Sequence, residues 1–83
     1  MSEISNKLHA FELLELAELH GVPTENGVRI DIRLTQQDLA AMVGASRESV
    51  NKVLGYFSAK GYISTGHHRI TLRRPAELKE RIY

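Results

Sequence analysis

The chain has 83 residues, which is enough for one small domain and too few for a second hydrophobic core. Its composition, 42% hydrophobic and 25% charged with a formal net charge of +1, is typical of a folded chain rather than a disordered tail. The absence of cysteine excludes disulfides and thiolate chemistry, and no apolar run approaches the roughly 20 residues that span a bilayer. We therefore expect residues 1–83 to form a single cytoplasmic domain with no membrane segment.

The first segment is rich in leucine at helical spacing and predicts an amphipathic helix capped by Ser5 or Asn6. Gly21 and Pro23 are expected to end it, because glycine suits the left-handed position after a helix and proline cannot continue one. The stretch "HGVPTENG" then predicts a stop followed by a loop. The expected buried face is Leu8, Phe11, Leu13, Leu14, Leu16 and Ala17, and the face expected in water is Glu12, Glu15 and Glu18.

The next stretch, "VRIDIRL" (residues 28–34), alternates apolar and charged side chains. This period of two is expected of a short strand with one face in water. No internal repeat or low-complexity linker interrupts the chain, so the strand leads directly into the central motif.

Two short helices around a tight corner are predicted after this strand. Thr35, followed three residues later by Asp38, resembles a capping box that opens a helix from about Gln36 to Val43. Gly44 can turn the chain sharply, and Ser46 can cap a second helix. This spacing is typical of a helix-turn-helix, whose second helix enters the major groove of DNA. A plain helical corner within a core is the alternative, and the spacing alone does not exclude it.

The second helix, expected over about Ser46–Lys60, separates its residues into two faces. Spacings of three and four place its apolar residues on one side. The expected core residues are Val50, Val53, Leu54 and Phe57, and the outward set is Arg47, Glu48, Asn51, Lys52 and Gly55.

A β-hairpin is predicted over about Tyr62–Leu72, with a turn at Gly66-His67-His68. A hairpin directly after a recognition helix is a wing, and this one lies in the basic half of the chain. Residues 47–83 hold eight Lys or Arg against three acids, whereas residues 1–20 hold one Lys against four Glu. A polyanion could bind the basic half, although charge asymmetry alone is also found on solvated faces. The side chains at the tip and outer strand suited to phosphate are His67, His68, Arg69, Arg73 and Arg74.

These elements predict an α+β, mainly α fold: a winged helix-turn-helix with a three-helix core, a β-hairpin wing and a short strand before the helix-turn-helix. From about Leu8 to Leu72 the sequence resembles the DNA-binding domain of the Crp–Fnr family, that of the cyclic-AMP receptor protein. The most specific part is "LTQQDLAAMVGASRESVNKVL", where Thr35, the run Gly44–Glu48 and Val50 fall where the family has them, followed by "YISTG". The resemblance implies sequence-specific binding of double-stranded DNA by a transcriptional regulator.

The resemblance also implies roles for individual residues. Arg47 matches the guanine-reading arginine and Glu48 the cytosine acceptor, and both roles fit the hydrogen-bonding chemistry of these side chains. Lys52 replaces a second base-contacting arginine, and Gly55 lacks the long basic side chain that relatives often have. The candidates for base contact are Arg47, Glu48, Asn51 and Lys52, and those for phosphate contact are Thr35, Gln37, Ser46, His67, His68 and Arg69.

Catalysis and metal binding are rejected on residue chemistry. His67 and His68 are adjacent and would point to opposite faces of a strand, and Ser46 has no nucleophile elbow and no nearby base. A winged helix that binds protein instead of DNA is the alternative function. It would need an apolar or acidic outer face on the second helix, whereas the expected face is polar and mostly basic.

Family resemblance implies a palindromic site with TGTGA-like half-sites and, in a full-length parent, RNA polymerase as a candidate partner. No cofactor is expected in this chain. A cyclic nucleotide or another effector is expected only if a separate N-terminal sensor domain exists. Because the family's dimerisation helix does not precede this domain, we expect the chain to be mostly monomeric and to bind single half-sites weakly.

Overall fold

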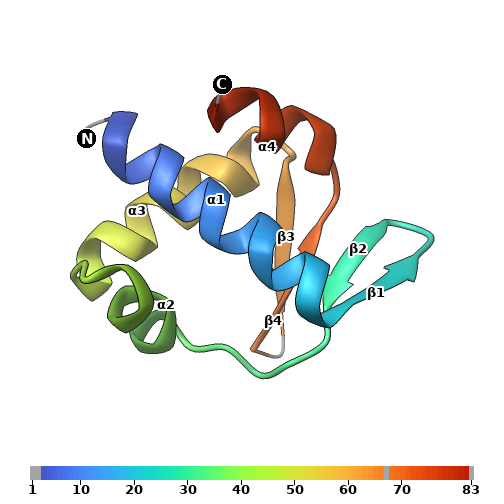
Figure 1. The fold of residues 1–83 in the computed structure, drawn as a ribbon, viewed down its shortest axis with the longest axis horizontal. Helices are drawn as coiled ribbons and strands as arrows, with labels where there is room; N and C mark the ends of the chain where they lie inside the picture. The colour runs from blue at the N-terminus through green and yellow to red at the C-terminus, as the bar shows by residue number, and fades with distance from the viewer. Residues whose placement is uncertain (1–2, 67, 83) are drawn as a thin grey trace.

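The computed structural model describes residues 3–66 and 68–82 and shows a mixed α+β fold (Figure 1). It contains the predicted helices, the predicted hairpin, and also a strand and a helix that the sequence patterns did not predict. In chain order the elements are α1 (Glu3–His20), β1 (Gly21–Thr24), β2 (Gly27–Ile30), α2 (Gln36–Val43), α3 (Arg47–Ala59), β3 (Ile63–Gly66), β4 (Arg69–Leu72) and α4 (Pro75–Ile82).

The strands form one antiparallel sheet in the order β1-β2-β4-β3. The wing is the hairpin β3-β4, and β2 pairs with its inner strand, so that Val28 lies opposite Leu72 and Ile30 opposite Ile70. Arg69 begins β4, which is an inner strand, and the prediction that it lies on an outer strand is therefore wrong. The pairing fixes the wing to the body of the domain through main-chain hydrogen bonds.

The predicted loop after α1 is a hairpin instead. Gly21–Thr24 pairs with Gly27–Ile30, and Pro23 is tolerated because β1 is an edge strand. Gly27, not Gly21, has the positive φ, of 132°. Gly21 permits a close approach instead, because a Cβ at this position would collide with the carbonyl oxygen of Ala17.

The strand predicted over residues 28–34 ends early, at Ile30. Its continuation leaves the sheet: the N–H of Asp31 donates to the carbonyl of His20, and that of Leu34 to the carbonyl of His68. The alternating apolar pattern continues past the last paired residue because Leu34, in the connection between β2 and α2, is also buried in the core.

Helix α1 begins before the predicted caps, so Ser5 and Asn6 lie within the helix. Its buried face also differs from the prediction. Leu8 and Phe11 are 48% and 56% exposed, whereas Glu12 is only 6% exposed. Glu12 is buried beside His9, whose Nδ1 lies 3.0 Å from the Glu12 carboxylate oxygen Oε1. This local contact partly offsets the cost of burying a carboxyl group, and a count of charged residues does not reveal it.

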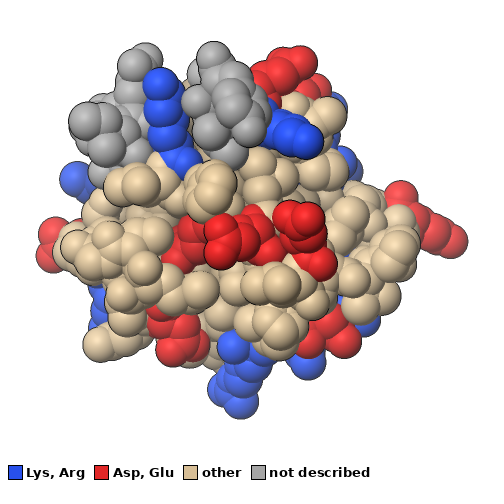
Figure 2. All heavy atoms as spheres, viewed as in Figure 1, with Lys and Arg blue, Asp and Glu red and all other residues tan. Residues whose placement is uncertain are grey.

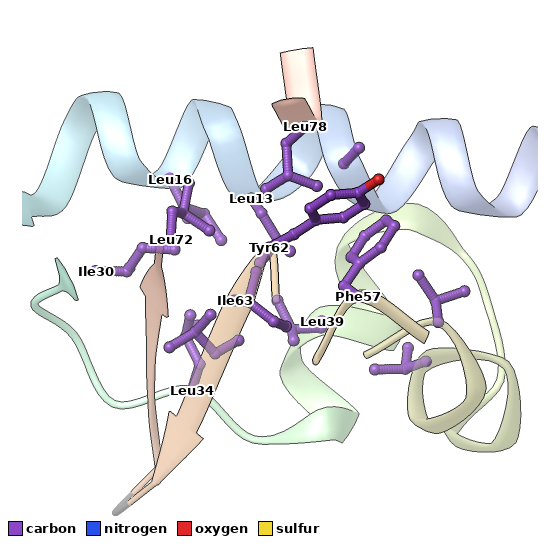
Figure 3. Packing of buried hydrophobic residues seen from close by; sticks show 14 of the residues in the cluster. Leu13, Leu16, Ile30, Leu34, Leu39, Phe57, Tyr62, Ile63, Leu72 and Leu78 are labelled. Atoms are coloured by element: carbon purple, nitrogen blue, oxygen red, sulfur yellow. The ribbon is translucent and has the colours of Figure 1, made fainter. Parts of the chain in front are cut away.

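The core lies between α1, the sheet and the helix-turn-helix (Figure 3). Leu13 and Leu16 point from α1 toward the strands, and Phe57 of α3 packs against Tyr62 with ring centroids 6.2 Å apart. Leu39 links α2 to the same cluster. The buried hydrophobic residues are Ala10, Leu13, Leu16, Ile30, Leu34, Leu39, Ala40, Val50, Val53, Phe57, Tyr62, Ile63, Ile70, Leu72 and Leu78.

Helix α4 packs against α1 and completes this core. It begins at Pro75, a favourable first helical residue, and Leu78 is fully buried. Arg73 and Arg74 lead into α4, at the end of β4 remote from the wing tip. The prediction that these two arginines lie on the tip or outer strand of the wing is therefore wrong. Arg74 lies 3.4 Å from the Glu77 carboxylate.

Replacing Leu78 by alanine should lower the free energy of unfolding by about 2–5 kcal/mol, because it removes a fully buried side chain that joins α4 to α1. Urea denaturation followed by circular dichroism measures the change. The matched control is Lys79→Ala, on the exposed side of the same helix, which should change the stability by less than about 0.5 kcal/mol. Equal stability of the two variants would show that α4 contributes nothing to the core.

Candidate nucleic-acid interface

The N-terminus of α2 is held by a reciprocal pair of hydrogen bonds. The N–H of Asp38 donates to Thr35 Oγ1, and the N–H of Thr35 donates to Asp38 Oδ2, both at 3.0 Å. The predicted capping box is thus confirmed. Two hydrogen bonds to the Asp38 carboxylate lower its pKa below the ordinary value of 3.8. The larger effect comes from the backbone N–H of Thr35 and the smaller one from the Thr35 hydroxyl.

The corner between α2 and α3 has the predicted geometry. Gly44 adopts φ 69°, and the N–H of Ala45 donates to the carbonyl of Ala40 at 2.8 Å. A Cβ at Gly44 would meet nothing within 4 Å, so the backbone conformation, not crowding, requires glycine. Ser46 caps α3 through a hydrogen bond from the N–H of Ser49 at 3.1 Å. The helix-turn-helix is therefore fixed by backbone and capping interactions on both sides of the corner.

The outward face of α3 carries the four predicted base-contacting residues, and Arg47, Glu48, Asn51 and Lys52 are all exposed. Arg47, Glu48 and Asn51 line one hollow with Ser46 and Gln36. Lys52, the residue after Asn51, lies outside that lining. The structure therefore brings three of the four together at the start of α3.

A second hollow continues the surface from α3 to the tip of the wing. It is lined by Leu34, Thr35, Gln36, Gln37, Arg47 and His68. Gln36 and Arg47 line both hollows, so the surface is continuous from the first turn of α3 past the start of α2 to the wing. We call this surface the recognition strip.

The wing tip is fixed beside α2 by its backbone. The N–H of Leu34 donates to the carbonyl of His68 at 2.7 Å. His68 has a φ of 62°, an unusual conformation for a residue with a side chain. Its exposed imidazole lies on the recognition strip. His67, the other predicted contact at the tip, lies outside the described residues.

Gln36 is a site residue that the sequence analysis missed. Its Nε2 donates to Asn51 Oδ1 at 3.0 Å, which links the start of α2 to the exposed face of α3. Its position as the first residue of α2, next to the selected Gln37, was the available signal. A contact between residues 15 positions apart could not be read from local spacing.

Arg69 is not part of the recognition strip. Its Nε lies 3.5 Å from Asp31 Oδ1, and the same oxygen lies 3.4 Å from a guanidinium nitrogen of Arg29. These three exposed or half-exposed side chains lie on the outer face of the sheet, beside the tip. A phosphate that reaches Arg69 would compete with Asp31 for it.

This arrangement of capped helices, exposed polar first turn and adjoining wing matches a known family. Residues 10–81 match the family described as the Crp-like helix-turn-helix domain. The chain belongs to this family. The mixed fold and the wing predicted from the sequence are confirmed, as is the function of the family: DNA binding in transcriptional regulators, not catalysis.

The relatives of this Crp-like domain are longer regulators. A CRP-like cAMP-activated global transcriptional regulator of Mycobacterium tuberculosis is 44% identical over 54 residues, which cover 65% of this chain and 24% of the relative. The transcriptional regulator SdrP of Thermus thermophilus is 39% identical over 77 residues, which cover 93% of this chain and 37% of the relative. The chain therefore spans less than two fifths of the length of these relatives.

A solved structure shows the same fold at lower identity. The CO-dependent transcription factor CooA from Carboxydothermus hydrogenoformans matches with a TM-score of 0.87 and 23% identity, over 94% of this chain and 36% of the CooA chain. Among the described residues, no helix is long and apolar enough to cross a membrane.

The lowered pKa of Asp38 predicts a specific pH dependence. The ionised carboxylate should stabilise the Crp-like domain above about pH 3.8, and this contribution should be lost as the pH falls through the lower pKa of the folded chain. An NMR titration of the Asp38 carboxyl carbon measures that pKa directly.

The Thr35→Val variant distinguishes the effect of the Thr35 hydroxyl on the Asp38 pKa from that of the Thr35 backbone N–H. It removes the hydroxyl and keeps the backbone N–H, so the Asp38 pKa should rise while remaining below 3.8. A titration identical to that of the wild type would show that the hydroxyl has no part in lowering the pKa.

Proposed function

We propose that residues 1–83 act as one DNA-binding domain that reads a half-site with the first turn of α3 in the major groove and the wing on the phosphate backbone. The observation that carries this proposal is the recognition strip, which places Arg47, Asn51 and His68 on one continuous exposed surface. A recognition helix contacts base edges with its N-terminal residues, which are the residues that line the strip.

The base-reading roles follow from donor and acceptor chemistry. Arg47 can donate two parallel hydrogen bonds to guanine O6 and N7, and Glu48 can accept from cytosine N4. The Oδ1 of Asn51 already accepts from Gln36, which leaves the amide N–H groups of Asn51 to donate to a base acceptor. Lys52, the next residue, is also exposed, and its ammonium can contact a base or a phosphate.

Phosphate contacts are proposed at the helix N-termini and at the wing. Ser46 accepts a capping hydrogen bond, and its hydroxyl retains its own hydrogen for donation to a phosphate oxygen. The hydroxyl hydrogen of Thr35 would be shared between a phosphate oxygen and the carboxylate of Asp38. Helix N-termini also favour anions electrostatically, and Gln37 lies in the first turn of α2. His68 and Arg69 supply donors from the wing, with Arg69 weakened by Asp31. The role of His67 remains a prediction from sequence.

The larger assembly is also a proposal. We propose a cytoplasmic protein that binds a palindrome of TGTGA-like half-sites, with the isolated chain mostly monomeric and RNA polymerase a partner of a longer parent. Relatives named cAMP-activated or CO-dependent suggest that an effector would act through a separate sensor domain. The domain itself is proposed to need no cofactor.

The direct test is an anisotropy titration of labelled duplexes at several salt concentrations. A duplex with one TGTGA half-site should bind more tightly than a scrambled duplex, and affinity for both should fall as salt rises. Equal affinity for the two duplexes would exclude sequence-specific reading of this half-site, and no binding to either would exclude DNA as the ligand of the isolated chain.

Replacing Arg47 by alanine should relax the preference for one G·C pair of the half-site at a cost of about 1–3 kcal/mol, because a bidentate contact to guanine is lost. Titrations against all four bases at each position of the half-site locate the affected pair. Lys79→Ala, on the exposed face of α4 outside the strip, is the matched control and should keep the wild-type preferences. An Arg47→Ala variant with unchanged base preferences would assign Arg47 to another role.

Replacing Arg69 by glutamine should weaken binding to all sequences alike and reduce the slope of log K against log salt by less than about 0.9, because Asp31 already neutralises part of its charge. Arg73→Gln removes the same charge at the far end of β4 and should leave the slope unchanged. Losses that differ between DNA sequences would contradict a contact restricted to phosphate.

A further inference from the structure

Gln36 and Asn51 form a hydrogen bond where the two hollows of the recognition strip meet. The Nε2 of Gln36 donates to Asn51 Oδ1 at 3.0 Å, and both side chains line the hollow at the start of α3. Asn51 is exposed, and this is its only side-chain hydrogen bond among the described residues. The orientation of the Asn51 amide therefore depends on Gln36.

The fold holds Gln36 in a fixed position relative to Asn51. Gln36 is the first residue of α2 and follows Thr35, whose reciprocal hydrogen bonds with Asp38 fix the start of that helix. Helix α2 in turn packs against α3 across the left-handed corner at Gly44. The donor of Gln36 therefore reaches Asn51 from a direction that the packing of the two helices sets.

The two ends of an asparagine amide read different groups on a base. The carbonyl oxygen accepts hydrogen bonds, whereas the NH₂ group donates them. In the usual contact with adenine both ends face the base, because Oδ1 accepts from N6 and Nδ2 donates to N7. Since Gln36 holds the Oδ1 of Asn51, the NH₂ group is the end left to face a base.

An amide that presents only N–H groups distinguishes two classes of base. Guanine O6 and thymine O4 are keto oxygens in the major groove and accept from such a donor. Adenine N6 and cytosine N4 are amino groups at the same edge, and they would face the N–H groups of Asn51 donor against donor. A held Asn51 therefore favours keto bases over amino bases.

The charge distribution favours DNA on the side of the molecule that carries this pair. Figure 2 shows acidic side chains across the centre of the face that α1 covers, with Lys and Arg toward its edges. That face repels a phosphate backbone. At the start of α3, by contrast, Arg47 is exposed and lines the same hollow as Asn51, so a base edge bound by Arg47 lies next to bases that Asn51 faces.

We propose that Gln36 is a positioning residue for base specificity: by holding Asn51 Oδ1, it makes Asn51 select a keto base, guanine or thymine, over an amino base, adenine or cytosine. Gln36 acts through Asn51 and touches no base itself. This inference rests on the proposed function, and it names the base chemistry that the site reads in addition to the contacts of Arg47 and Glu48.

The test uses the complete 83-residue chain and duplexes that carry each of the four bases at every position of the half-site. Fluorescence anisotropy gives the affinities. The Asn51→Ala variant locates the pair that Asn51 reads, because the preference at that pair is lost. There we expect the wild type to bind the better keto base about tenfold more tightly than the better amino base on the same strand.

The Gln36→Glu variant reverses the hydrogen bond. An ionised carboxylate only accepts, so Asn51 Nδ2 should donate to it and Oδ1 should turn to the base. The preference at the pair should therefore switch from keto to amino bases. Gln37→Glu, an equal change of charge at the next residue, is the matched control: it should lower the affinity for all duplexes and keep the keto preference. Circular dichroism like that of the wild type shows that both variants fold.

Two further variants test whether Gln36 acts through Asn51. In the Asn51→Ala background, Gln36→Glu should no longer change any base preference, because the side chain that it orients is absent. Gln36→Met keeps a similar length without an amide, and it should reduce the keto preference by about threefold because the Asn51 amide is released. A switch that persists without Asn51 would show that residue 36 contacts the base directly, and would overturn the proposal.

The outcomes distinguish failure of this inference from failure of the proposed function. Base preferences that stay unchanged in both Gln36→Glu and Gln36→Met would overturn this inference alone, provided that the pair read by Arg47 is still discriminated. A wild-type preference for an amino base at the pair read by Asn51 would also overturn it alone. A wild-type chain that discriminates no base at any position would overturn the proposed function and this inference together.

Discussion

The rotation of α3 about its own axis is fixed by Val50, Val53 and Phe57, whose side chains have no exposed surface. Turning the helix would bring these groups into water, at a cost of roughly 1.5–3 kcal/mol for each. Since the helical period places Arg47 and Asn51 on the opposite side, burial of one face determines which groups the other face presents. The chemistry of the recognition strip thus depends on apolar packing that lies beneath it.

The sheet extends the same constraint to the wing. Because β4 pairs with both β2 and β3, the hairpin is held on two sides rather than projecting freely. The hydrogen bond between Leu34 and His68 then connects the tip to the segment that enters α2. The helix-turn-helix and the wing therefore keep a fixed spacing. A DNA-binding surface needs such a spacing, because the groove and the phosphate backbone of DNA are themselves a fixed distance apart.

Local signals predicted the helix-turn-helix well. The capping box of Thr35 and Asp38, the left-handed Gly44 and the Ser46 cap are short-range interactions, so their residue types alone indicate the structure. The misses depended on tertiary contacts. Strand β1 forms because it pairs with β2, and α4 is held because Leu78 is buried where α4 packs against α1. Local sequence patterns contain no information on either contact.

The candidate site divides in the same way. The outward residues of α3 were found from periodicity, whereas the contact of Gln36 with Asn51 and that of Arg69 with Asp31 join segments distant in sequence. Helix α1 shows the converse error. Its leucines were expected to be buried and its glutamates exposed, but Glu12 is buried and Phe11 is not, because the positions of α2 and α4 decide which side of the helix is covered.

The hydrogen bond between Gln36 and Asn51 limits how the specificity of this domain can change. Each side chain sets the orientation and the number of free donors of the other, so the two positions form a pair rather than two independent determinants. A substitution at position 36 would alter the base contact proposed for Asn51 even if residue 36 touched no DNA. Mutant libraries that vary one position at a time would miss double substitutions at positions 36 and 51 in which a new donor and a new acceptor form the hydrogen bond.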